Sequence, residues 1–149
     1  MDIEGSRRVY VRSTPTEARL RGVEAEKITV NLGVVDLGQI DLLVREGFYN
    51  NRADFIRTAV RNQVATHAEV LKQTVARRTL VLGLQHYTRA DLEAALAAGQ
   101  KVDINVLGLA SIAHDVSPEL AQAAIGTVLV LGALHASPAV KAALADRTA

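Results

Sequence analysis

The stretch Lys27–Val64, KITVNLGVVDLGQIDLLVREGFYNNRADFIRTAVRNQV, decides the fold because its hydrophobic pattern changes from a strand-like to a helix-like period. The first part, KITVNL, alternates apolar and polar side chains, which predicts a short strand with one buried face. The apolar face holds Ile28, Val30 and Leu32, and the polar face holds Lys27, Thr29 and Asn31.

Two helical patterns follow this strand, separated by a break at Gly47–Asn51. The first has its apolar side chains at helical spacing, at Leu37, Ile40, Leu43 and Val44. The second opens with Asn51, three residues before Asp54, which is a variant of the capping box. Gly33 and Gly38 weaken the first helix, since an interior glycine costs up to about 1 kcal/mol. We therefore expect this helix to depend on packing against a second chain.

A single strand leaves its backbone donors and acceptors unpaired, and two short helices cannot enclose a core. A second copy of the chain would supply both. Strand, helix, the turn GFYNNR and the helix DFIRTAV together resemble the ribbon-helix-helix family of DNA-binding proteins, the Arc, MetJ and CopG type. The resemblance covers residues 26–65, about a quarter of the chain. It implies an intertwined dimer whose antiparallel two-stranded ribbon enters the major groove of double-stranded DNA.

Two groups of residues are the candidate DNA contacts. Lys27, Thr29 and Asn31 carry ammonium, hydroxyl and amide groups that can read base edges from the ribbon. The alternative for these three is an ordinary exposed strand face. At the second helix, unpaired N–H groups and the positive dipole end favour a phosphate. The phosphate clamp would consist of Asn50, Asn51 and Arg52, and the alternative there is simple helix capping.

The second helical pattern does not stop at Val64, because no Gly or Pro occurs between there and Gly83. We expect one helix from about Arg52 to Arg77, which would be about 40 Å long at 1.5 Å per residue. Residues 26–78 would then form the DNA-binding domain with an extended second helix. Residues 1–25 form a polar leader with several arginines, which is either mobile or a basic arm that contacts phosphates.

Residues 79–149 contain an internal repeat in which the triplet Val-Leu-Gly recurs at Val81, Val106 and Val130. Each triplet is followed by a helix-start signal, at Thr88, Ser117-Pro118 and Ser137-Pro138. Strand-helix alternation predicts a small α/β module of three repeats with parallel strands and right-handed crossovers, or a short stack like that of leucine-rich repeats, so that the whole chain is of the α+β class. The strands are apolar on both faces, yet three helices can cover only one. We therefore expect an oligomerisation module.

Enzyme motifs such as HExxH, GxSxG, GxGxxG and GxxxxGK[ST] are missing, so we expect no catalytic residues and no cofactor. His86 and His135 each stand three residues after the glycine of their Val-Leu-Gly triplet, and His114 is close in sequence. Imidazole groups bind transition metals, so a metal site is one hypothesis for these residues. Ser111 stands at that offset in the middle repeat and the chain has no Cys. We therefore expect no metal.

Hydrophobic residues make up 49% of the chain and charged residues 22%, as in a folded domain. No apolar run reaches transmembrane length and Met1–Gly5 opens no signal peptide, so we expect a cytoplasmic protein without a membrane partner.

The sequence as a whole predicts a homodimeric or higher-order regulator that binds specific DNA sites and represses transcription, with no small-molecule substrate. Two alternatives keep the same DNA-binding domain at residues 26–78. One is an antitoxin whose residues 79–149 bind a toxin, and the other is a DNA-associated scaffold that polymerises through its repeats.

Overall fold

The computed structural model describes residues 25–149, so the leader expected at residues 1–25 lies outside the described residues except for Ala25. The described chain divides into two compact units. The front unit is Lys27–Thr74, and the described part of the back unit consists of Ala25, Glu26 and Val75–Ala149. We describe each unit by itself.

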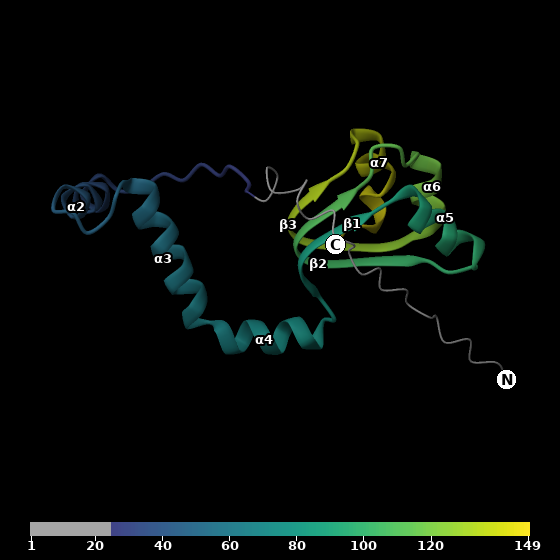
Figure 1. Ribbon diagram of the computed structural model, residues 1–149, viewed down its shortest axis with the longest axis horizontal. Helices are drawn as coiled ribbons and strands as arrows, with labels where there is room; N and C mark the ends of the chain where they lie inside the picture. Colours follow the sequence, from purple (N-terminus) through teal and green to yellow (C-terminus); the bar gives the residue numbers. More distant parts are fainter. Residues whose placement is uncertain (1–24) are drawn as a thin grey trace. The chain divides into compact units, whose positions relative to one another are not determined.

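Helices make up the front unit, drawn in blue and teal in Figure 1. Helix α2 spans Val34–Arg45, α3 spans Arg52–Thr66, and α4 spans Ala68–Arg77 and ends in the back unit. Gly33 is the N-terminal cap of α2 without a side-chain bond, as expected from its missing side chain. The helix–turn–helix order expected from Leu37–Val64 is therefore present.

The single helix expected from Arg52 to Arg77 is wrong, because α3 ends at Thr66 and α4 begins at Ala68. His67 between them has φ −103° and ψ 15°, outside helical geometry. The Thr66 hydroxyl donates to the carbonyl of Asn62 at 3.0 Å. Such back-bonding by Thr competes with the helix ladder and bends or ends helices. The chain changes direction at this point (Figure 1).

The strand expected at Lys27–Leu32 is not formed in the single chain, where residues 25–33 are neither helix nor strand. The physical reason is the absence of a partner backbone in one isolated front unit, since a strand exists only through its ladder. Ile28, on the apolar side of the alternation, is 79% exposed. This segment therefore carries its apolar side chains without a core to bury them.

The back unit is the three-repeat α/β module that the sequence predicts. Its strands are β1 Val81–Tyr87, β2 Val102–Ile112 and β3 Ile125–His135. They form one parallel sheet in the order β1-β2-β3 (Figure 1). The repeated triplets lie side by side, because Val81 pairs with Val106 and Val106 with Val130. Equivalent positions of the sequence repeat are thus paired with one another across the sheet.

The backbone geometry of the sheet explains why each triplet contains a glycine. Gly83, Gly108 and Gly132 are neighbours across the sheet and have φ of +118°, +139° and +126°. A Cβ on Gly108 would lie 2.2 Å from the Gly83 carbonyl oxygen, and one on Gly132 would lie 2.1 Å from that of Gly108. Only glycine permits both this backbone conformation and this close approach.

Three helices begin where the sequence signals place them. They are α5 Arg89–Ala97, α6 Pro118–Ala124 and α7 Pro138–Ala143. Thr88 and Asp91 form a complete capping box, and the Ser117 and Ser137 hydroxyls accept from backbone N–H groups. Each cap satisfies helix donors that would otherwise lack partners.

All three helices pack on the same face of the sheet and enclose one core. Its fully buried members include Leu92 of α5, Ala121 of α6, Val140 of α7 and Ile104 of β2. After α7, a short 3₁₀ turn, η1 Ala145–Arg147, leads the chain back to β3, where the Ala149 N–H donates to Val128. No described helix covers the opposite face of the sheet, which we call the open face. The leucines on this face include Leu82, which is 73% exposed, and Leu131, which is 45% exposed, whereas Leu109 on β2 is 4% exposed.

Candidate nucleic-acid interface

The polar residues of the alternating segment are all exposed in the structure. Lys27, Thr29 and Asn31 reach solvent along the extended chain that precedes α2. Among the described residues, none of their side chains has a hydrogen bond to another part of the chain. Their groups are therefore available for base edges, which is what a reading segment requires.

The turn between α2 and α3 holds the two helices together with few contacts. Ile40 of α2 is 6% exposed and is the front unit's buried hydrophobic residue. Tyr49 and Phe55 pack edge to face with ring centroids 5.0 Å apart. An aromatic pair of this kind contributes about 1 kcal/mol. The two-helix hairpin is thus held mainly at its turn.

The N-terminus of α3 is capped as the sequence predicts. The Asn51 side chain accepts from the Asp54 N–H at 2.8 Å, and the Asp54 carboxylate accepts from the Asn50 N–H at 2.9 Å. Asn51 has the extended backbone typical of a cap residue. Asn50 and Asn51 therefore have a capping role, and the Asp54 carboxylate already lies against the N–H groups of this turn.

Arg52 has a partner that the sequence did not reveal. Its Nε donates to Asp41 Oδ1 at 2.7 Å, and a terminal nitrogen donates to Asp41 Oδ2 at 2.8 Å. The hydrogen bonding that Arg52 donates to Asp41 lowers the pKa of the Asp41 carboxyl and raises the pKa of Arg52. This fork-to-fork pair joins α2 to the start of α3. It fixes the guanidinium at the turn.

Large apolar side chains remain exposed along the whole front unit. On α3 they follow a helical stripe at Ile56, Val60 and Val64, and α4 continues with Val70 and Leu71. Val34 and Val35 at the start of α2 and Phe48 in the turn are exposed as well. A soluble single chain rarely leaves so much apolar surface uncovered. The front unit therefore requires another surface to complete its core.

Formal charge does not single out the DNA-binding surface. The front unit holds six Lys and Arg against five Asp and Glu, a net of +1, and residues 75–149 hold six of each. The positive net charge of the front unit agrees with phosphate contacts, but the two units differ by too little charge to identify the DNA-binding surface. The interface must be inferred from shape and side-chain chemistry.

The histidine row expected from the repeat is present, because His86 pairs with Ser111 and Ser111 with His135 across the sheet. Within residues 25–149, however, no group of three or more His, Cys, Asp or Glu side chains is arranged to hold a metal ion. In the same part of the chain, no helix is long and apolar enough to cross a membrane.

The sequence matches the Ribbon-Helix-Helix transcriptional regulator family over residues 23–141. This match covers most of the chain, which therefore belongs to that family. It is a family of DNA-binding transcriptional regulators, as the front unit suggested. The match also runs through the sheet and into α7, well beyond the resemblance seen at residues 26–65. No curated protein and no solved structure matches the chain significantly.

Proposed function

We propose that the protein is a homodimeric repressor that reads operator DNA with a ribbon formed by residues 27–32 of two chains. The observation that carries this proposal is the incomplete front unit. An extended segment with alternating side chains precedes two helices that bury a single hydrophobic residue. A second copy would pair the backbone of the segment and cover the apolar stripe in one step.

In the proposed dimer the two segments run antiparallel, so that one face of the ribbon packs on the helices and the other enters the major groove. Ile28, Val30 and Leu32 would then fill the space between the two helix pairs. Lys27, Thr29 and Asn31 would contact base edges, because side chains alternate between the faces of a strand.

Asn50, Asn51 and Arg52 would approach the phosphate backbone beside the ribbon. The Asp41 pair supports a positioning role for Arg52, since a guanidinium has five N–H donors and Asp41 uses only two of its nitrogens. The Asp54 carboxylate at this turn argues against a deep phosphate site. We therefore assign these residues to a peripheral phosphate contact and give most of the affinity to the ribbon.

The back unit would associate two or more chains through its open face. Leu82 on this face is 73% exposed, and Leu107 and Leu131 continue the same row on β2 and β3. The occupant we propose is the back unit of another copy. Once the front units have dimerised, the two back units are tethered, which raises their effective concentration to the millimolar range.

Repression would follow from occlusion of the promoter, and linked dimers would occupy neighbouring half-sites. The ordered core of the back unit favours this function over an antitoxin, whose toxin-binding segment we expect to fold only on its partner. We place the protein in the cytoplasm, where such a regulator meets its DNA.

The direct test is selection of binding sites from random duplex DNA by the full-length protein and by Asn31→Ala. We expect the variant to select a changed or degenerate site, since one lost bidentate base contact costs about 1–3 kcal/mol of discrimination. An unchanged selected sequence would show that Asn31 does not read bases.

A matched pair of lysine variants separates the ribbon from the back unit. Lys27→Ala should weaken binding and, if Lys27 contacts phosphate, reduce the log–log salt slope by about 1 for each chain. Lys101→Ala removes the ammonium of another exposed lysine, in the back unit, and should leave binding unchanged. Equal losses in the two variants would point to non-specific charge attraction and count against the ribbon.

A further inference from the structure

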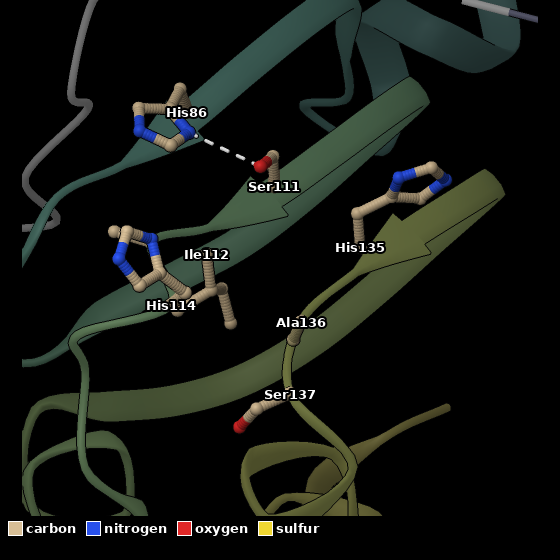
Figure 2. Close-up of a pocket in the computed structure, with 8 residues that line it drawn as sticks. His86, Ser111, Ile112, His114, His135, Ala136 and Ser137 are labelled. Atoms are coloured by element: carbon tan, nitrogen blue, oxygen red, sulfur yellow. Dashed lines mark hydrogen bonds between the residues drawn. The ribbon is translucent and has the colours of Figure 1, made fainter. Parts of the chain in front are cut away.

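A hollow of about 530 Å³ opens at the carboxyl edge of the parallel sheet, in the back unit. It is lined where the three strands end and where the segments leading to α6 and α7 begin (Figure 2). The lining contains three of the four histidines of the protein together with two serines. Carboxyl ends of parallel strands are a frequent place for ligands, because several loops converge there.

The chemistry of the lining is rich in hydrogen-bond donors and free of acids. Its polar members are His86, Ser111, His114, His135 and Ser137, and the rest are Ile112, Ala113 and Ala136. Imidazole and hydroxyl groups donate to carboxylates, and none of the residues that line the hollow carries a carboxylate of its own. The hollow therefore favours an anion over a cation.

His86, Ser111 and His135 form a row across its rim. His86 Nδ1 and Ser111 Oγ lie 3.2 Å apart (Figure 2), and this bond orients the His86 ring. The two histidines occupy matching positions on β1 and β3, with β2 between them. With strands about 4.8 Å apart, their backbones are separated by about 10 Å. A molecule with an acidic group at each end could contact both rings.

One histidine of this row already contacts a carboxylate of the protein itself. His135 Nε2 lies 2.6 Å from Glu26 Oε1, so one rim imidazole already binds a carboxylate. The side chains of His135 and Glu26 are 35% and 55% exposed. An exposed pair of this kind contributes little net stability, so that an incoming carboxylate could replace Glu26.

We propose that this hollow binds a small dicarboxylate, one carboxylate at His135 in place of Glu26 and the other at His86 and Ser111. The site also offers a route to regulation, because Glu26 immediately precedes Lys27, the first residue of the proposed ribbon. Ligand binding would release this tether and alter the ordering of the DNA-reading segment. Only this coupling rests on the proposed function.

The test uses the full-length protein and succinate as the probe, followed by calorimetry and by the NMR signals of the imidazoles. We expect saturable binding that shifts His86 and His135. His135→Ala and His86→Ala should each weaken it about tenfold, the value of one hydrogen bond to a charged group. His67→Ala is the matched control, since His67 is the histidine outside the hollow.

Glu26→Gln gives a readout that a purely structural role would not produce. Removal of the competing carboxylate should tighten succinate binding, by about threefold for an exposed pair. Three results would each overturn the site: binding that does not saturate, equal affinities of the three histidine variants, and weaker succinate binding by Glu26→Gln. Saturable binding of inorganic phosphate or Zn²⁺ without binding of succinate would overturn the ligand class.

The coupling is tested separately by DNA affinity with and without saturating succinate. A changed affinity in the wild type that is lost in His135→Ala supports the tether, and an unchanged affinity overturns it. If the protein failed to bind DNA at all, the proposed function would fall, whereas the succinate titrations would still decide the site.

Discussion

The two units of the chain differ in how much of their own core they contain. Among the described residues, the buried hydrophobic residues apart from Ile40 belong to the back unit, and most of them lie between the sheet and its helices. Of the fifteen large hydrophobic residues that are exposed within residues 25–149, the front unit instead holds twelve. The back unit is thus complete within one chain on its helix-covered face. In the proposed dimer the front unit would be completed by a second chain, so that its folding would be coupled to dimerisation.

The largest expected effect concerns the glycines that set the sheet register. Gly132→Ala combines a positive φ with a Cβ placed 2.1 Å from a backbone oxygen. We expect it to lower the free energy of unfolding of the back unit by about 3–4 kcal/mol. Gly83→Ala has the same kind of φ but open space around the Cβ. It should cost about 1–2 kcal/mol. Chemical denaturation measures both, and equal costs would remove the close-approach explanation.

A matched pair of core truncations compares the two units directly. Ile104 is fully buried in the back unit, and Ile104→Ala should cost about 2–5 kcal/mol at every protein concentration. Ile40→Ala in the front unit should instead shift a transition whose midpoint rises with concentration, since in the proposed dimer its folding would include association. Thermal unfolding over a wide concentration range tests this. A front transition independent of concentration would contradict the comparison.

A substitution at an exposed position of the front unit should be as disruptive as a substitution in a buried core. Val60 is exposed on α3 in the single chain, so Val60→Lys would ordinarily change stability by less than about 0.5 kcal/mol. We expect it to convert the dimer to monomer, because the ammonium would be buried between chains. Sedimentation velocity measures the shift. Arg57→Lys, a change at an exposed position of the same helix, is the control that should stay dimeric.

The smallest effect is confined to the back unit at high pH. Burial raises the pKa of Tyr87 to about 12 from its ordinary value of 10.0. The neutral phenol is favoured in the folded state, so its contribution is present below pH 10 and is lost as the pH rises toward 12. Tyr87→Phe should remove this loss. A variant that retained the full wild-type pH dependence between 10 and 12 would exclude Tyr87 as its source.

Much of the back unit could be predicted from the sequence, because its signals are local. Thr88, Ser117 and Ser137 mark the starts of its three helices, and the repeated Val-Leu-Gly triplets mark the strands. The glycine contacts could not be predicted, because they depend on the register between strands. The parallel pairing of β1, β2 and β3 was predicted from alternation alone and is confirmed.

The front unit was less predictable because its decisive contacts are not periodic. The α3 helix ends at Thr66, whose hydroxyl donates to the Asn62 carbonyl, whereas the spacing of the apolar residues continues past this point. The Arg52–Asp41 pair joins residues from different helices, 11 positions apart. The DNA contacts assigned to Lys27, Thr29 and Asn31 stay a prediction, since they require a second chain and a duplex.

The most direct test of the account is disulfide formation between single cysteines placed in turn at residues 27–32. The wild type has no Cys, so each variant reports only its own position. In a two-fold antiparallel ribbon, opposed Cα atoms lie about 4.5–5.5 Å apart, within the range of a disulfide. Thr29→Cys, at the centre of the polar face, should cross-link most and its neighbours less. Glu119→Cys on α6 is the exposed control. Yields no higher than that control at every position would contradict the ribbon.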